Sequence, residues 1–454
     1  MQTNVRNREA RLRTAQKLAL AACLFGAPAL QAQAPAELRQ VLERLDRLEE
    51  QNRALIEEVR ALRQELSASH PAEPAPVEER VAVQETRVAE LAQTKVEASQ
   101  RFPIRITGTA LFNTFFNSNS TSDTGYPTFA PPGGEHSAGA TFRQTTLGLE
   151  YLGPRTFGDG KVRGSVLMDF FGGSGRTLDQ VVRLRTAVLG VDWTSRSVEA
   201  GIEKPLISPR DPDSLAQVGV SPLSGAGNLW LWIPQVRVEQ KLRLGDGAAL
   251  RAQVAAVQTS ESLPGTANPA YAPAYDGRRP GVEGRLEFSR GEEHRIEVAP
   301  GFHRSVSHAA GTSIPSNIFS IDWFARPLAV AEFKGAFFTG QNVTPLGAGG
   351  YRQGYTISGS RYARAVHSRG GWAQLTLQAA PRLSFHLFSG AQDDRERGLT
   401  AGSIGRNLVY GANFFYRLAP NVLASFEASQ ARTSYVDGAR RLNNHYDLAL
   451  GYLF

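Results

Sequence analysis

The last ten residues of the chain alternate strictly between large apolar side chains and small or polar ones. The two sets are Tyr446, Leu448, Leu450, Tyr452 and Phe454 on one parity and His445, Asp447, Ala449 and Gly451 on the other. A period of two is the spacing of a β-strand, whose successive side chains point to opposite faces. A soluble β-sandwich would use such a segment as a half-buried strand, whereas an outer-membrane barrel would place it between lipid and a wet lumen.

The same patterning recurs from Phe102 onward. The sixteen predicted strands cover 104–116, 145–153, 161–171, 181–191, 197–203, 229–242, 248–258, 281–289, 294–303, 318–326, 329–339, 371–379, 382–390, 406–417, 421–431 and 443–454. In the fourth of these, Val182, Leu184 and Val188 are predicted to face outward. An even number of strands is what a bacterial single-chain barrel needs if both of its ends are to lie on the periplasmic side.

The connections between these segments alternate in length. Long stretches are predicted at 117–140, 204–228, 259–280, 304–317, 340–370 and 391–405. Short turns fall between most of the other neighbours, as hairpins on one side of a barrel require. A soluble sandwich of several domains has no reason to separate loop lengths in this way. We therefore predict an all-β transmembrane barrel of sixteen antiparallel strands over residues 101–454, with Phe454 ending the strand that closes it.

The first hundred residues read differently. Basic residues precede a short apolar core and then small residues, which predicts a secretory signal peptide over 1–32, with cleavage near Ala32 or Ala34. A lipoprotein cleavage site at Cys23 is the alternative. Residues 33–69 carry apolar heptads with Asn52 at a core position. This pattern predicts a periplasmic coiled coil, and a coil of three helices is favoured. A lone helix lying on its own barrel is the alternative. A proline-rich spacer and a short helix follow over 70–100.

Composition excludes several classes of protein. Cys23 is the only cysteine and lies in the predicted signal peptide, so the mature chain has no disulfide framework and no cysteine-based metal or catalytic site. The barrel region is basic but lacks clustered Lys/Arg runs, which argues against nucleic acid as a partner. None of the common hydrolase, zinc-protease or nucleotide-binding motifs occurs, and we expect no cofactor. We interpret His303, His386 and His445 as hydrogen-bonding residues of the lumen, not as catalytic bases.

Strand parity predicts an unusually charged lumen. The inward basic residues are Arg163, Arg183, Arg185, Arg237, Lys241, Arg251, Arg285, Arg295 and Lys334, and the inward acidic residues are Asp169, Glu199, Glu239, Glu283, Glu287, Glu297, Asp322 and Glu332. One hypothesis is that these charges pair across neighbouring strands and stabilise the wall. The other is that an excess of arginine near a constriction attracts and orients anions.

Two loops carry further candidate residues. The stretch 204–228 has no strand pattern and contains Lys204 and Arg210 beside acidic residues, and such a loop could fold back into the pore. The stretch 349–371 contains Arg361 and Arg364 among tyrosines and no acid. It could collect anions at the mouth, bind lipopolysaccharide phosphates, or be an ordinary solvated loop.

Three segments carry a family resemblance: "VLMDFFGG", "RLRTAVLGVDW" and "NLWLWIPQVRVEQKL", all between Val166 and Leu242. With them the chain resembles the DcaP-like trimeric porins, which are related to phosphate-selective porins. The resemblance implies a sixteen-stranded trimeric channel for small anionic solutes, typically dicarboxylates, with Arg183, Arg185 and Arg237 lining the pore. Where that family has a Gln-Thr-Trp segment, this chain reads "GIEKPLISP". The resemblance therefore does not identify the solute.

The function that we predict is an outer-membrane porin for passive diffusion of small anionic solutes. The expected partners are two further copies of the chain in a homotrimer, the lipid bilayer with its lipopolysaccharide, and the solute itself. One alternative is a structural tether whose coiled coil reaches towards the cell wall. Others are a phosphate-type anion channel and an enzyme built into a barrel.

Overall fold

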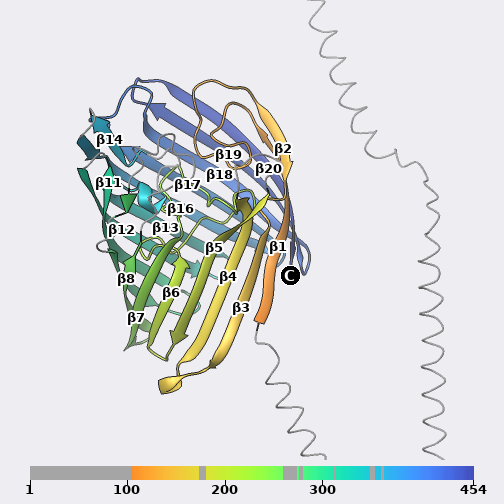
Figure 1. Ribbon diagram of the computed structural model, residues 1–454. Helices are drawn as coiled ribbons and strands as arrows, with labels where there is room; N and C mark the ends of the chain where they lie inside the picture. The colour runs from red at the N-terminus through yellow and green to blue at the C-terminus, as the bar shows by residue number, and fades with distance from the viewer. Residues whose placement is uncertain are drawn as a thin grey trace, which may run out of the picture. The chain divides into compact units, whose positions relative to one another are not determined.

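The computed structural model describes residues 104–172, 180–258, 274–275, 280–309, 312–347, 353–358 and 362–454. The predicted signal peptide, coiled coil and spacer lie outside these residues. Sixteen strands form the wall (Figure 1): β1 (Ile104–Asn117), β3 (Thr146–Arg155), β4 (Lys161–Gly172), β5 (Val181–Asp192), β6 (Arg196–Glu203), β7 (Ile233–Gly245), β8 (Ala248–Val257), β10 (Gly281–Arg290), β11 (Ile296–Ala309), β12 (Thr312–Leu328), β13 (Ala331–Gln341), β16 (His367–Ala380), β17 (Leu383–Asp394), β18 (Ile404–Ala419), β19 (Val422–Tyr435) and β20 (Arg440–Leu453).

The wall is a closed antiparallel barrel. Each strand pairs with the next wall strand along the chain, and β1 pairs with both β3 and β20. Two backbone hydrogen bonds extend the closing pair, because the Gly108 amide donates to the Phe454 carbonyl (3.0 Å) and the Phe454 amide donates to the Gly108 carbonyl (3.2 Å). The predicted strand number and the closing role of Phe454 are therefore confirmed.

The alternation along β20 separates an apolar outer face from a polar inner one. Leu448 and Tyr452 are 56% and 52% exposed. His445 and Asp447, on the inner face of the same strand, are 1% and 2% exposed. Large exposed apolar side chains of this kind recur on nearly every wall strand. In water such a surface would be unfavourable, and in a bilayer it is the lipid-facing band of a barrel.

The described residues also form four short strands outside the sixteen. β2 (Ser137–Thr141) pairs with the upper part of β1, and β9 (Ala274–Tyr275) pairs with β11. β14 (Tyr355–Ser358) and β15 (Tyr362–Ala365) form a hairpin in the long connection after β13. The described residues also form two single 3-10 turns, η1 (Phe157–Asp159) and η3 (Thr344–Leu346). Among the described residues, no helix has the length and apolar character needed to cross a membrane.

One predicted loop was wrong. The stretch 304–317 was expected to be a long connection, but β11 and β12 continue through it and pair up to Ala309 and Thr312. The alternation persists there, since Ser305 and Ser316 are buried in the lumen, but small polar residues on the inward side weaken its apolar contrast. The predicted start of the strand at 229 was also early, because β7 begins at Ile233.

A β-bulge corrects the predicted orientation of Val188. Leu167 on β4 faces Thr186 on β5, but the next residue, Met168, faces Leu184, so that Arg185 is an extra residue without a cross-strand partner. The parity of β5 changes at this point. Val188 is therefore 6% exposed on the inner side, whereas it was predicted to face outward.

Candidate functional site

The connection between β6 and β7, residues 204–232, lies inside the barrel, and we refer to it as the inner loop (Figure 1). Near its start, the Leu206 amide donates to Glu283 on β10 (2.6 Å). Further along, the Leu215 carbonyl accepts from Asn113 on β1 (2.8 Å). Because β10 and β1 belong to distant parts of the wall, the inner loop crosses the lumen, as its lack of strand pattern suggested.

Asp213 anchors the inner loop to four wall strands. Its carboxylate lies 2.8 Å from Lys334 Nζ on β13, 2.5 Å from Gln374 Nε2 on β16 and 3.6 Å from His386 Nδ1 on β17. Its carbonyl accepts from Asn413 on β18 (2.8 Å). Burial opposes ionisation of this carboxyl, but the hydrogen bond with His386 and the charge of Lys334 outweigh burial and hold the pKa of Asp213 below its ordinary value.

The two basic candidates of the inner loop are both paired. Arg210 reaches the wall, where it pairs with Asp322 on β12 (2.6 Å) and with Glu297 on β11. Lys204 pairs with Asp211 of the same loop (2.5 Å). Both side chains therefore hold the inner loop in place, and neither adds uncompensated charge to the lumen.

Four predicted inward arginines on β4, β7, β8 and β10 form what we call the arginine ladder: Arg163, Arg237, Arg251 and Arg285. The ladder alternates with carboxylates. Glu199 lies 2.5 Å from Arg163 and 2.7 Å from Arg237, and it is only 3% exposed. Arg163 also pairs with Asp192 (2.7 Å).

The other half of the ladder is neutralised in the same way. Glu287 pairs with Arg251 and lies 2.8 Å from Arg285. Arg285 also donates to both oxygens of Asp322 (2.8 Å each). The ladder lines a polar cavity of about 340 Å³ beneath the start of the inner loop. Every arginine of the ladder has a carboxylate partner. Here the geometry agrees with the first hypothesis, that inward charges pair across neighbouring strands.

The residues around Asp169 are arranged differently. Asp169 is fully buried on β4, and Arg183 binds it at two points, through Nε (3.0 Å) and Nη2 (2.6 Å). Arg185, the bulged residue, also approaches Asp169 (3.6 Å). Two guanidinium groups thus share one carboxylate. Arg183 also donates to the Gly219 carbonyl (2.5 Å), which places this group where the inner loop meets the wall.

Aromatic rings surround these arginines. The guanidinium carbon of Arg185 lies 4.6 Å from the centre of the Trp232 ring, and that of Arg143 lies 4.4 Å from the centre of the Phe171 ring. Both distances are typical of cation–π contacts. Arg185 Nε, the atom that lies 3.6 Å from Asp169, is buried and donates no hydrogen bond within the described residues. We call Arg143, Asp169, Arg183, Arg185 and Trp232 the Asp169 cluster, and its described charges sum to an excess of positive charge.

The remaining candidates lie towards the two ends of the barrel. Arg295 precedes β11, is half exposed and pairs with Glu297. Lys241 is exposed at the turn-side end of β7. Arg364 is exposed on the β14–β15 hairpin, and Arg361 lies outside the described residues. The structure therefore does not bring these residues to the inner loop.

The wall opposite the arginine ladder is rich in neutral polar groups. Its buried inward side chains on β1 and β16 to β20 include Asn113, Asn117, Gln374, His386, Gln392, Asn407, Asn413, Asn443 and His445. Glu427 and Asp447 face each other across β19 and β20. Glu427 accepts from Ser214 (2.6 Å) and Asn413 (2.9 Å), and Asp447 accepts from Asn113 (2.8 Å). The histidines are hydrogen bonded, as His445 Nδ1 is to Asn117 Oδ1 (2.9 Å).

Sequence reasoning missed three members of this interior. Asp213 was seen only as an acid that offsets the loop's positive charge, and neither Arg143 nor Trp232 was singled out. The unusual "WLW" at 230–232, which was included in the predicted strand 229–242, was a usable signal, since such large aromatic side chains need an apolar or cationic partner. Within the described residues, no group of three or more His, Asp or Glu side chains is placed to hold a metal ion.

Comparisons with known proteins agree on the fold. The structure is similar to the outer membrane channel DcaP of Acinetobacter baumannii, with a TM-score of 0.61 and 16% identity over 77% of this chain and 97% of that one. It is also similar to the anion-selective porin from Comamonas acidovorans, with a TM-score of 0.54 and 9% identity over 77% and 99% of the two chains. No family model and no curated protein matches the sequence. At these identities the likeness establishes a porin-type sixteen-stranded barrel.

Proposed function

We propose that this protein is an outer-membrane porin, a passive diffusion channel for small anionic solutes, with dicarboxylates or similar carboxylates as the favoured class. The closed barrel with an apolar outer face and a polar interior supports a channel in the outer membrane. The similar solved structures support it further, since one is an outer membrane channel and the other an anion-selective porin.

The Asp169 cluster is the observation that supports the anionic preference. Arg183 and Arg185 share a single carboxylate, and Arg143 stacks on Phe171, with Asp123 near enough to act on its charge but not in an ion pair with it. A surplus cation between low-dielectric walls focuses its field into the lumen and raises the local concentration of anions. The arginine ladder contributes less, because its charges are matched by Glu199, Glu287 and Asp322.

The chemistry of arginine favours carboxylates as the solutes. A guanidinium offers two parallel N–H donors that match the two oxygens of a carboxylate. Arg183 uses this two-point geometry on Asp169, while the buried Arg185 Nε lies 3.6 Å from the same carboxylate and donates no hydrogen bond within the described residues. A solute carboxylate passing the inner loop would compete with Asp169 for these donors. Conduction needs the contacts between solute and protein to be weak. Competition from Asp169 for the same arginines would keep them weak, because the arginines return to Asp169 when the solute leaves.

The proposed location and assembly rest on the predicted N-terminal segments. A signal peptide over 1–32 would direct the chain to the periplasm, and the coiled coil over 33–69 would stand on the periplasmic side of the barrel. We propose a homotrimer held together by that coiled coil and by barrel contacts, in a bilayer that contains lipopolysaccharide. The protein acts without a cofactor and is not an enzyme in this proposal.

Solute influx into proteoliposomes tests this function. The folded full-length protein would be offered a four-carbon dicarboxylate and an uncharged polyol of similar size, in separate swelling assays. We expect faster influx of the dicarboxylate. Added phosphate distinguishes the phosphate-type channel, because phosphate would then outcompete the dicarboxylate. Equal influx of both solutes would remove the anionic preference, and a folded protein that admits neither solute would favour the tether.

A further inference from the structure

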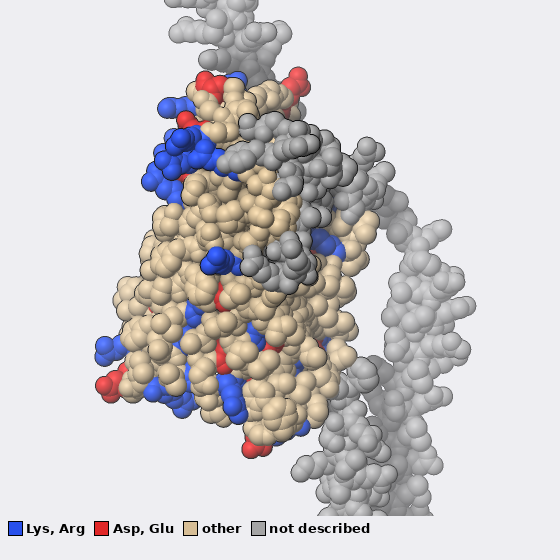
Figure 2. Space-filling model, turned by 60° about the vertical axis from the view of Figure 1, so that its left-hand side comes forward, with Lys and Arg blue, Asp and Glu red and all other residues tan. Residues whose placement is uncertain are grey.

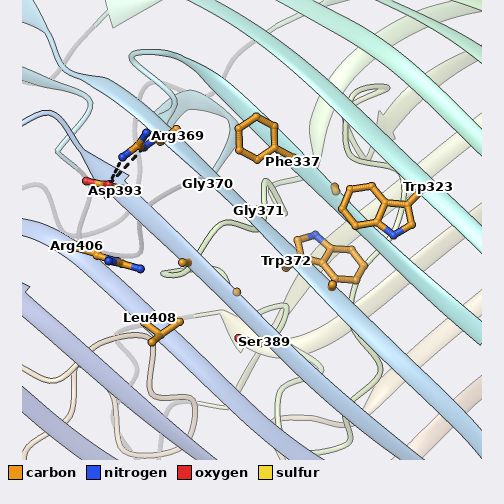
Figure 3. Close-up of a pocket in the computed structure, with 14 residues that line it drawn as sticks. Trp323, Phe337, Arg369, Gly370, Gly371, Trp372, Ser389, Asp393, Arg406 and Leu408 are labelled. Carbon is orange, nitrogen blue, oxygen red and sulfur yellow. Dashed lines mark hydrogen bonds and ion pairs between the residues drawn. The ribbon is translucent and has the colours of Figure 1, made fainter.

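A groove of about 600 Å³ lies on the outer wall, across β12, β13 and β16 to β18. Figure 3 shows Phe337 and Trp323 on one side of the small residues Gly370 and Gly371, with Leu408 on the other side. The groove is not part of the lumen, because Phe337 and Trp323 belong to the outward parity of their strands.

Small side chains make the floor of the groove. On β16 the outward positions are Gly371 and Ala373, and on β17 their cross-strand partners are Ala391 and Ser389. Larger outward residues on the flanking strands leave a channel between them, since β13 presents Phe337 and β18 presents Leu408. The elongated floor is apolar apart from the Ser389 hydroxyl, which donates to the Val409 carbonyl (3.2 Å).

Arginines lie at the loop-side end of this groove. Cross-strand register places Arg369, Asp393, Arg406, Ser434 and Arg440 in one row across β16 to β20. Arg369 pairs with Asp393 (2.8 Å), whereas the described residues supply no ion pair for Arg406 or Arg440. We call these five residues the arginine row. In Figure 3, Arg369, Asp393 and Arg406 lie together at one end of the groove.

The row lies where the apolar outer band meets the rim that carries the long loops. Figure 2 shows Lys and Arg gathered at the upper rim of the visible face, above a broad band of uncharged residues. In a barrel whose short turns are periplasmic, this rim faces the outer leaflet. Phosphate groups of membrane lipids lie at such a boundary, and arginine binds phosphate with two-point geometry.

The chemistry of the outer wall disfavours a second copy of the chain as the occupant. Within the described wall strands, Asp393 is the one carboxylate at an outward position, because the other strand acids have inward parity. The wall strands of a neighbouring copy therefore offer Arg406 and Arg440 only Asp393, which already pairs with Arg369. A lipid brings both phosphate for the row and acyl chains for the groove.

We propose that this groove binds one phosphorylated glycolipid of the lipid A type, with an acyl chain over Gly371, Ala373 and Ala391 and a phosphate on Arg406. Arg369 and Arg440 flank that phosphate. The site rests on the proposed outer-membrane location but not on conduction, because it lies outside the lumen. It would fix one lipid on this face of each barrel.

Native mass spectrometry of the folded full-length protein in detergent, titrated with diphosphorylated lipid A, tests the site. We expect one adduct per chain at low lipid concentration. Arg406→Gln removes the phosphate partner, and Ser389→Phe fills the groove from the lipid side without touching the lumen. Each should weaken binding at least tenfold. Arg304→Gln is the matched control, since Arg304 is an exposed outward arginine of β11 outside the groove, and it should bind as the wild type does.

Three results would overturn the proposal. Lipid binding that is equal in the wild type, Arg406→Gln and Ser389→Phe would show that the groove is not the site, as would the absence of any adduct. Loss of oligomers in Ser389→Phe, measured in the same spectra, would assign the groove to contact between copies. None of these results depends on whether the protein conducts, so a failure here is separate from a failure of the proposed function.

Discussion

Asp169 and Glu199 each serve two arginines, yet the consequences for the lumen differ. Glu199 bridges Arg163 and Arg237, and Arg163 has Asp192 as a second partner. Within the described residues, no second carboxylate forms an ion pair with Arg183 or Arg185, although the charge of Asp211 also acts on Arg185. Selectivity should therefore respond to single substitutions in opposite directions at these two places.

Arg185→Gln should lower the preference for anions. It removes the surplus cation, while Arg183 keeps its two-point contact with Asp169, so the barrel stays folded. We expect the ratio of chloride to potassium permeability to fall by roughly twofold or more, because fixed charges in a cleft strongly bias local ion concentrations. Reversal potentials measure this ratio. Arg155→Gln, at an exposed site beside a turn, is the control and should leave the ratio unchanged.

The double replacement of Arg183 and Arg185 by alanine is a less clean test. It would leave the fully buried Asp169 without either partner. An unpaired buried charge of this kind costs about 3–5 kcal/mol. We therefore expect this variant to lose stability together with selectivity, which the single variant avoids.

Glu199→Gln should change selectivity the other way. It leaves two arginines facing the lumen with one carboxylate fewer, so the preference for anions should rise. The loss of stability should stay below the roughly 3–5 kcal/mol of a fully buried orphan charge, since Arg163 and Arg237 keep 35% and 24% of their side-chain surface in solvent. Reversal potentials and urea unfolding measure the two effects. A shift towards cations would contradict this account of the ladder.

At the scale of elements, the inner loop depends on a few long-range contacts. Asp213→Asn removes the ion pair with Lys334 and weakens the contacts with His386. Losing a partner of buried polar groups costs about 1–3 kcal/mol of stability. This cost destabilises the inner loop and not the wall, because the wall strands keep their backbone hydrogen bonds. We expect larger and noisier single-channel conductance. Asp393→Asn, on the outer face, is the control, and equal conductance in all three proteins would mean that Asp213 does not hold the loop.

The strands that were predicted well are those with strong contrast between their two faces. In β20, Leu448 and Leu450 alternate with Asp447 and Ala449, so both the strand and its orientation were readable. The ends of β11 and β12 were not, because Ser305 and Ser316 line a polar lumen and resemble loop residues. Val188 was placed on the wrong face because a bulge at Arg185 cannot be seen in the periodicity.

The candidate site shows the same division. Parity alone was enough to place the arginine ladder on the inner wall, but partners depend on register between strands. The anchor at Asp213 was beyond sequence reasoning, because Gln374 follows it by 161 residues and no local pattern links the two. The surplus charge at Asp169 likewise appears only once Arg143, Arg183 and Arg185 are brought together.

At the scale of the whole molecule, the closed wall, the inner loop and the Asp169 cluster are the three parts of the proposed channel. In the proposed channel the wall would isolate a polar path from lipid, the inner loop would narrow that path, and the Asp169 cluster would give the narrow part a positive field. The basic excess of the chain as a whole is not needed for this account, since most of the interior charge is paired. A predicted coiled coil over 33–69 would join three such barrels.

The reversal potential of the full-length protein in a planar bilayer under a KCl gradient tests the central claim most directly, with conductance steps counted for each insertion. The account predicts an anion-selective current that appears in groups of three steps. A cation-selective current, or a folded protein that carries no current, would contradict it.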